Sequence, residues 1–341
     1  MNYRSYGKII KGVGGLYYVR LSDKIKDTLD GTPEADGYVY RQNCDGKIVE
    51  CRARGVFRHN HITPLVGDNV EIVYNDSSFT EKDGETVFAL GGRNIMISDI
   101  LPRRNSLIRP PVANIDTIFV TMASASPEPM TDMVDKLISI LEFNDIEPVI
   151  VIGKCELCRE RAEELRRIYT LAGYRVFVLS CRENEGIEEI REFVSREMGG
   201  KTSAFAGASG VGKSSLMNKL FPSLSLLTSD ISYKIERGKN TTRHVELYPV
   251  SEGSDGYIAD TPGFSMLDFE RFDFFTKEDL PETMREFRDY IGHCRYTKCS
   301  HTKEEGCAIL EAVGSGDIAK SRHESFIQMY DVLKNKKDWK K

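Results

Sequence analysis

Residues 207–214, with the sequence GASGVGKS, constrain this chain more than any other stretch. They fit the pattern G-x-x-x-x-G-K-[ST], in which the backbone N–H groups of a glycine-rich turn cradle phosphate. Residues 202–206 read as a strand that enters this turn, and 215–220 read as a helix whose N-terminus adds positive potential. We expect Lys213 to reach the β- and γ-phosphates and Ser214 to contact Mg²⁺. The motif therefore predicts that a nucleoside triphosphate binds here. The predicted phosphate-site residues are Gly207, Ala208, Ser209, Gly210, Val211, Gly212, Lys213, Ser214 and Ser215.

Length and charge narrow the class of protein only broadly. A chain of 341 residues is long enough for two or three domains. Its formal net charge of −5 provides no overall attraction to nucleic acid. Residues 1–11 lack the apolar core of a signal peptide, and no apolar run approaches the roughly 20 residues that span a bilayer. We therefore expect a cytoplasmic monomer that makes no membrane contact.

The first hundred residues predict a β-rich domain. Short alternating stretches are separated by glycine, proline, asparagine and aspartate, as is typical of strands joined by turns. Several such strands without intervening helices favour a small barrel of the OB type. The expected strands are 15–21, 37–41, 48–54 and 68–74.

Basic side chains gather around the third of these strands and beyond the last. They suit contact with RNA phosphates, since OB-type barrels bind oligonucleotides through their strand faces and loops. They equally suit solvated strand edges, which Lys and Arg protect against pairing with another chain. Both interpretations stay open on the sequence. The residues are Arg52, Arg54, Arg58, His59, His61, Arg103, Arg104 and Arg109.

Beyond Pro110-Pro111 the pattern changes to alternating strands and helices, which is typical of a parallel sheet covered by helices. Most of these units precede the phosphate loop, and only two strands follow it. This order is unusual, because the loop ordinarily follows the first strand of its sheet. The expected strands are 115–123, 148–153, 175–180, 202–206, 245–250 and 257–260, and the expected helices are 133–143, 160–171 and 187–198.

Asp260 ends the last expected strand, in the sequence DTPG. An Asp at this place can hold Mg²⁺, and the N–H of Gly263 can meet the γ-phosphate. The polar segment 229–244 lies between the phosphate loop and this motif. It suits a switch loop in which the hydroxyl of Thr241 or Thr242 closes on Mg²⁺ when the γ-phosphate is present. A plain polar connection is the alternative.

Selection of the base requires a further loop, and nothing after Gly263 suits it. Upstream, one apolar strand ends in GKCE and the next ends in SCR. Both sequences lie at C-terminal strand ends, where α/β sheets bind their ligands. The base-binding elements therefore precede the phosphate-binding elements, which indicates a circular permutation. The candidate base-binding residues are Gly153, Lys154, Glu156, Ser180 and Cys181.

Three cysteines and one histidine cluster near the C-terminus: Cys294, Cys299, His301 and Cys307. Zn²⁺ takes four such ligands tetrahedrally, and a Cys₃His set without a vacancy is structural and not catalytic. The neighbouring His293 falls outside this pattern. Free surface thiols are the alternative, but four soft ligands within fourteen residues favour one structural metal ion.

Together these features resemble the circularly permuted GTPases, and within them the family of ribosome small-subunit-dependent GTPase A. The resemblance implies an N-terminal OB-fold domain at 1–108, a central permuted GTPase domain at 109–270 and a zinc-binding domain with a C-terminal helix at 271–341. It also implies GTP hydrolysis stimulated by the small ribosomal subunit late in its maturation, binding of ribosomal RNA, and the cofactors GTP, Mg²⁺ and one Zn²⁺. It is carried by 7–19 (GKIIKGVGGLYYV), 51–58 (CRARGVFR), 64–70 (PLVGDNV), 108–116 (IRPPVANID), the phosphate loop, the Thr-Thr pair, 260–264 (DTPGF) and the Cys/His cluster.

The chain departs from the family pattern at Gly153, where Asn or Thr is usual, and at Glu156, where Asp is usual. Asn240 replaces the His to which the family assigns catalysis. Glu156 keeps the carboxylate that guanine requires, and Asn240 can orient a water although it cannot take its proton. We therefore expect preference for GTP over ATP and slow intrinsic hydrolysis. A passive GTP- or GDP-binding RNA assembly factor and an ATPase are the alternatives. The expected catalytic residues are Asn240, Thr241, Thr242, Lys213 and Gly263.

Overall fold

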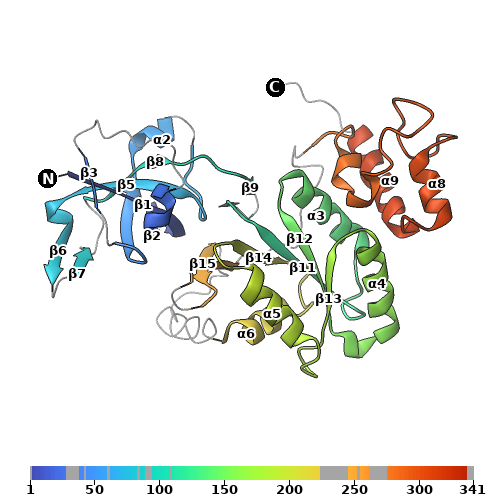
Figure 1. Ribbon diagram of the computed structural model, residues 1–341, viewed down its shortest axis with the longest axis horizontal. Helices are drawn as coiled ribbons and strands as arrows, with labels where there is room; N and C mark the ends of the chain where they lie inside the picture. Colours follow the sequence, from blue (N-terminus) through green and yellow to red (C-terminus); the bar gives the residue numbers. More distant parts are fainter. Residues whose placement is uncertain are drawn as a thin grey trace. The chain divides into compact units, whose positions relative to one another are not determined.

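The computed structural model divides the chain into two compact units, each of which is built from separate stretches of sequence (Figure 1). The first contains Met1–Ile115, Gly200–Thr202 and Lys234–Pro262, and the second contains Asp116–Gly199, Ser203–Tyr233 and Gly263–Lys341. The structure describes residues 2–27, 38–41, 44–59, 62–82, 85–88, 94–107, 110–222, 245–251, 254–260 and 275–335. Within these ranges no helix has both the length and the apolar character needed to cross a membrane.

Strands of the first unit close into a barrel, which confirms the predicted N-terminal fold. The ring of pairings runs from β1 to β2, β4, β8 and β5, and returns to β1. Closure leaves these strands without a free edge, and fully buried side chains such as Ile9, Val19 and Ile72 belong to the core. The strands are β1 (Asn2–Val13), β2 (Leu16–Leu21), β4 (Ile48–Ala53), β5 (Asn69–Asn75) and β8 (Met96–Ile100).

Shorter elements complete the barrel region. They are α1 (Asp23–Asp27), β3 (Val39–Tyr40), α2 (Gly55–His59), the 3₁₀ helix η1 (Asp76–Ser78), β6 (Phe79–Lys82), β7 (Glu85–Phe88), β9 (Ser106–Leu107) and β10 (Val112–Ala113). Arg103 ties the segment that leaves the barrel back to it. Its Nε and Nη2 donate to the two carboxylate oxygens of the buried Asp68 at 2.7 and 2.8 Å, and Nη2 also donates to the carbonyl of Thr63. Arg103 therefore has a structural role, although the sequence left RNA contact open for it.

A parallel sheet with the strand order β13, β12, β11 and β14 forms the centre of the second unit (Figure 1). Every residue of β11 and β14 is buried, as expected for strands covered on both faces. This confirms the predicted α/β architecture. The elements are β11 (Thr117–Ala123), α3 (Thr131–Phe143), β12 (Glu147–Gly153), the 3₁₀ helix η2 (Cys155–Leu157), α4 (Arg159–Leu171), β13 (Arg175–Val178), α5 (Ile187–Glu197), β14 (Thr202–Ala206) and α6 (Lys213–Leu220).

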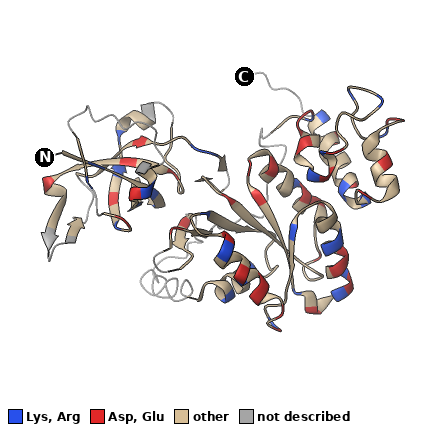
Figure 2. Cartoon of the chain, viewed as in Figure 1, with Lys and Arg blue, Asp and Glu red and all other residues tan. Residues whose placement is uncertain are grey.

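The outer faces of the covering helices carry charges of both signs. Figure 2 shows Lys and Arg interspersed with Asp and Glu along α4 and α5. Several pair with a neighbour one turn away, such as Arg161 with Glu164 at 2.7 Å and Arg166 with Glu163 at 2.9 Å. Exposed pairs of this kind contribute little stability each, so these faces are ordinary solvated surfaces.

The two strands that follow the phosphate loop in sequence form an antiparallel hairpin in the first unit. They are β15 (Glu246–Pro249) and β16 (Tyr257–Asp260). Their register sets Glu246 opposite Asp260, and β15 also pairs with β1 through Lys11. The Lys11 ammonium lies 2.8 Å from the Glu246 carboxylate, which supports this pairing.

Residues 275–335, which we call the Cys/His module, belong to the second unit. Their elements are the 3₁₀ helices η3 (Leu280–Thr283) and η4 (Arg285–Phe287), α8 (Ala308–Ser315) and α9 (Lys320–Asn335). Buried Phe287, Ile309, Phe326 and Met329 are part of one apolar cluster in the module. That cluster also includes Ile140 of α3, so the core of the module is shared with a helix of the parallel sheet.

Candidate nucleotide and metal sites

The phosphate loop connects β14 to α6, as its sequence predicts. Gly207 follows the strand with φ of +144°, and a Cβ there would collide with the carbonyl oxygen of Thr121. Only glycine can therefore pass so close to β11. Gly212 precedes the helix with φ of +106°, and α6 begins at Lys213, two residues earlier than its apolar pattern suggests. The loop thus ends on the first turn of a helix, where N–H groups are free to bind an anion.

Lys213 lies against its own loop. Its ammonium donates to the carbonyls of Gly207 at 2.7 Å and Ala208 at 2.8 Å. Burial lowers the pKa of Lys213 from its ordinary value, because the charged form is less well solvated there. The lysine is thus held at the centre of the loop, within reach of any phosphate group that the loop binds.

The two upstream loops lie at the C-terminal ends of β12 and β13. They are joined by a hydrogen bond in which the N–H of Cys155 donates to the carbonyl of Leu179 at 3.2 Å. Lys154 has φ of +56° and donates through its ammonium to the carbonyl of Ser126 at 2.7 Å. The hydroxyl of Ser180 accepts from the N–H of Glu183, so it organises its own turn.

Gly153 lies beside the phosphate loop. A Cβ at this position would be 3.3 Å from the carbonyl oxygen of Val211, a tight contact. The backbone of the loop after β12, which we call the base loop, therefore packs directly against the phosphate loop. The family carries a larger side chain at this place. A larger side chain at this position would require a small shift of the phosphate loop.

One pocket of about 430 Å³ brings the upstream loops and the phosphate loop together. The carboxylate oxygen Oε2 of Glu156 is buried and has no hydrogen-bond partner among the described residues. An unpaired buried acceptor is unfavourable and is therefore suited to a ligand that donates N–H groups. From the candidate set the pocket is lined by Gly153, Lys154, Glu156, Cys181, Val211, Gly212 and Ser215.

Sequence reasoning missed several residues that line the same pocket. They are Thr121, Leu157, Leu179, Arg182, Leu216 and Lys219. Leu216 and Lys219 lie on α6. Residues three or four apart share a face of a helix, so their spacing from Gly212 could have indicated them. Thr121 carried no local signal, because β11 reads as a continuous apolar strand.

Part of the predicted site lies outside the described residues, namely Asn240, Thr241, Thr242 and Gly263. Asp260 is the last residue of β16, at a strand end as predicted.

The four predicted metal ligands meet in the Cys/His module. One donor atom from each of Cys294, Cys299, His301 and Cys307 lies within 4.8 Å of all the others. The sulfurs of Cys294 and Cys307 are 3.9 Å apart, and Nδ1 of His301 is 3.5 and 3.6 Å from them. Tetrahedral Zn–S bonds of about 2.3 Å would separate two sulfurs by about 3.8 Å, so the donor set fits one zinc-sized ion. His293 is not part of this group.

The protonation behaviour of the cluster is also consistent with a metal site. Burial raises the pKa of Cys299 to about 12, and the nearby thiols of Cys307 and Cys294 add to that effect. Crowded thiolates need a cation to be stable, and a bound metal deprotonates a thiol outright. Burial lowers the pKa of His301, which favours the neutral imidazole that binds metals.

Glu304 supports the ligand loop and was not identified from the sequence. Its carboxylate accepts hydrogen bonds from the N–H groups of Ser300, Thr302 and Lys303, each at 3.1 Å, and from the Ser300 hydroxyl. Burial alone would raise the pKa of Glu304, but these hydrogen bonds outweigh it and hold the pKa at about 2. The turn that carries His301 is therefore capped by a carboxylate that stays ionised.

Comparison with known proteins places the chain in one family. Its residues 100–270 match the family model RsgA GTPase, and residues 36–79 match the RsgA N-terminal domain. It is 40% identical over 98% of its length to the small ribosomal subunit biogenesis GTPase RsgA of Agathobacter rectalis, of which 99% is covered, and 38% identical to that of Enterococcus faecalis, with 94% and 97% covered.

Two solved structures have a similar fold. YjeQ from Thermotoga maritima is 29% identical with a TM-score of 0.70, covering 98% of this chain and 100% of that one. YloQ, described as a circularly permuted GTPase, is 31% identical with a TM-score of 0.69, covering 98% and 96%. With the barrel, the permuted order of the loops and the Cys₃His group in place, the chain belongs to the RsgA GTPase family.

Proposed function

We propose that this chain is a GTPase that acts in biogenesis of the small ribosomal subunit, late in its maturation, and that the subunit activates it. The observation that carries the proposal is the pocket in which the base loops, upstream in sequence, converge on the phosphate loop. The names of the relatives, which are small ribosomal subunit biogenesis GTPases, supply the cellular role. In this role we expect the protein to be cytoplasmic and monomeric and to contact ribosomal RNA.

The nucleotide roles that we assign are those expected from the motifs. Lys213 binds the β- and γ-phosphates, the Ser214 hydroxyl and the Asp260 carboxylate hold Mg²⁺, and the N–H of Gly263 meets the γ-phosphate. Glu156 accepts the two guanine N–H donors with its unpaired carboxylate oxygen and the oxygen beside it.

Hydrolysis then depends on positioning more than on a strong base. Phosphoryl transfer proceeds through a loose transition state, so an aligned water and compensating positive charge suffice. We assign alignment of the water to Asn240 and closure on Mg²⁺ to Thr241 or Thr242. Because an amide cannot accept the proton, intrinsic turnover is slow, and it rises when the chain binds the subunit.

The metal that we assign to Cys294, Cys299, His301 and Cys307 is one Zn²⁺. Three sulfurs and one imidazole suit Zn²⁺ better than Mg²⁺ or Ca²⁺, which prefer oxygen ligands. Four protein ligands leave no open position, so the ion stabilises the module and takes no part in hydrolysis.

Phosphate release with and without purified small subunits tests the main proposal. We expect GTP turnover to be slow alone and to rise at least tenfold on the subunit, because the subunit completes the positioning of the attacking water. ATP should give little release in either case. If GTP turnover does not change when subunits are added, the chain is instead a passive nucleotide-binding assembly factor.

A Glu156→Gln variant tests base selection. Hydrogen bonds to a charged group contribute about 1.5–3 kcal/mol, so GTP affinity should fall by about 10- to 150-fold, whereas ATP affinity should not change. Titration calorimetry measures both. Glu160→Gln, on the exposed side of α4, is the matched control and should leave both affinities unaltered. Equal affinities of the unmodified chain for GTP and ATP would contradict the guanine assignment.

A further inference from the structure

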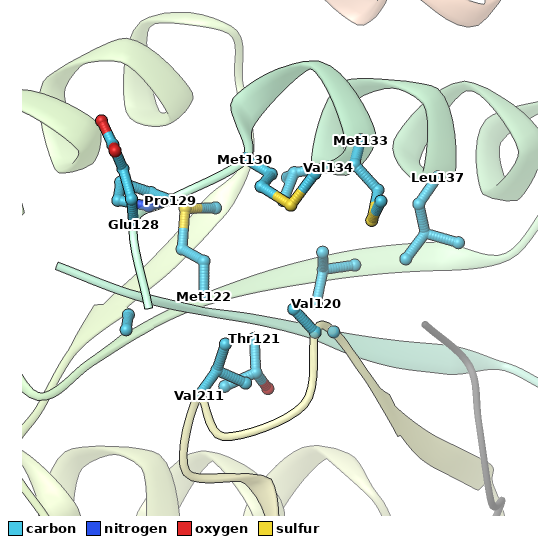
Figure 3. A pocket seen from close by; sticks show the side chains of 13 residues that line it. Val120, Thr121, Met122, Glu128, Pro129, Met130, Met133, Val134, Leu137 and Val211 are labelled. Atoms are coloured by element: carbon cyan, nitrogen blue, oxygen red, sulfur yellow. The ribbon is translucent and has the colours of Figure 1, made fainter. Parts of the chain in front are cut away.

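Helix α3 contributes side chains both to a pocket that the phosphate loop also lines and to the contacts that hold the Cys/His module. On one face, Met130 at its N-terminus and Met133, Val134 and Leu137 line an apolar pocket. Gly207, Ala208 and Val211 of the phosphate loop line the same pocket. In Figure 3 the side chains of Met133 and Leu137 lie over Val120 of β11, with Val211 of the loop on the far side of the strand. This face of α3 and the phosphate loop therefore line one pocket, together with β11.

A buried ion-pair network anchors another face of α3 to the module. Arg322 of α9 is fully buried, and its Nη1 donates to Oδ1 of Asp135 on α3 at 2.6 Å. Its Nε donates to Glu286 of η4 at 2.7 Å. The hydroxyl of Tyr169 on α4 donates to the same oxygen of Asp135 at 3.0 Å. The guanidinium of Arg322 thus joins α9 and η4 of the module to α3.

Further contacts continue this anchorage along α3 toward its C-terminus. Glu142 pairs with Arg285 at 2.6 Å and with Arg288 at 2.8 Å, and both arginines belong to the module. Ile140 lies in the apolar core of the module, and Phe143 packs on Phe275 with ring centroids 5.2 Å apart. Packed cores resist gradual deformation, so these contacts couple the position of α3 to that of the module.

The phosphate loop contains a switchable contact at the pocket that it lines together with α3. The Lys213 ammonium holds the carbonyls of Gly207 and Ala208, and both of these residues line the apolar pocket. A bound diphosphate draws the ammonium toward its own oxygens, which removes the donor from those two carbonyls. Nucleotide binding therefore changes the loop side of the pocket that Met133 and Val134 also line.

We propose that α3 transmits nucleotide occupancy from the phosphate loop to the Cys/His module, with Arg322 as the residue that fixes the module to this helix. The inference rests on the proposed binding of phosphate by Lys213. Coupling through α3 differs from a route along the chain through residues 261–274, because it requires only packing within the described part of the second unit. Coupling of this kind is reciprocal, so a partner that binds the module also changes nucleotide affinity.

Amide hydrogen exchange of the full-length protein, with and without Mg²⁺-GDP, tests the proposal. In the unmodified chain we expect GDP to slow exchange in the phosphate loop, in α3 and also in α9 by about fivefold or more. In Arg322→Met, protection of the loop should remain while the effect on α9 is lost. Met133→Ala alters the pocket side of α3 without disturbing a buried charge, and it should also reduce the slowing of α9 exchange by GDP.

Arg103→Met is the matched control, because it removes another arginine from a buried aspartate but does so in the barrel. It should leave the GDP effect on α9 unchanged. Protection confined to the phosphate loop in the unmodified chain overturns the inference and leaves the proposed function standing. Absence of protection even at the phosphate loop overturns the nucleotide assignment itself, so the two failures are distinguishable.

Discussion

Replacement of Lys213 by alanine is expected to lower subunit-stimulated GTP hydrolysis by about 10²- to 10³-fold, the usual effect of removing one group that stabilises transition-state charge. The ammonium is held at the centre of the phosphate loop, and burial strengthens its interaction with anions. The variant also leaves the carbonyls of Gly207 and Ala208 without this donor, so nucleotide affinity should fall as well. Single-turnover phosphate release and titration with GDP separate the two effects.

Lys201→Ala provides the control for the loss of one positive charge. Lys201 precedes β14, whereas the phosphate loop follows that strand, so the two lysines lie at opposite ends of it. Hydrolysis by this variant should equal that of the unmodified chain. Stimulated turnover that survives in Lys213→Ala would show that the phosphate loop does not carry the reaction.

Loss of the metal is expected to unfold the Cys/His module. Structural Zn²⁺ contributes about 10–16 kcal/mol of apparent binding free energy in zinc-finger peptides, which is comparable to the whole stability of an ordinary domain. Cys307 is buried and stands directly before α8, so Cys307→Ser removes a ligand and disturbs the start of that helix. Metal analysis should show a fall from one Zn²⁺ per chain to none, and α8 and α9 should lose exchange protection.

Cys158→Ser is the control for that experiment, since Cys158 is a half-buried thiol outside the metal cluster. It should retain one Zn²⁺ and the native exchange pattern. A Cys307→Ser protein that still holds one Zn²⁺ with an unchanged module would contradict the proposed ligand set.

The sequence predicted those features that local patterns encode. Buried parallel strands such as β11 read as unbroken apolar runs, and the phosphate loop has a fixed glycine spacing that its backbone requires. The order of these elements was enough to predict the permutation, because parallel strands bring their C-terminal ends to one edge whatever their place in the chain. The Cys₃His group was likewise predicted, since its ligands are close in sequence.

Features that depend on distant contacts could not be predicted. The pairing of β15 with β1 joins residues 235 positions apart, as in Lys11 and Glu246, and neither segment signals its partner. Arg322 reads as an ordinary charged residue of a helix, yet it is fully buried because Asp135 and Glu286 come to it from two other elements. Gly153 was predicted as a base-loop residue, but its close approach to the carbonyl oxygen of Val211 could not be predicted.

The sharing of Ile140 and Asp135 with the Cys/His module has a practical consequence for dissecting the protein. A fragment that begins after Gly263 would separate the guanidinium of Arg322 from one of its two carboxylates and would open one side of the module's apolar core. Such a fragment would fail to fold independently even with its zinc bound. A stable excised piece has to begin before β11, so the smallest autonomous unit that contains the metal also contains the nucleotide-binding sheet.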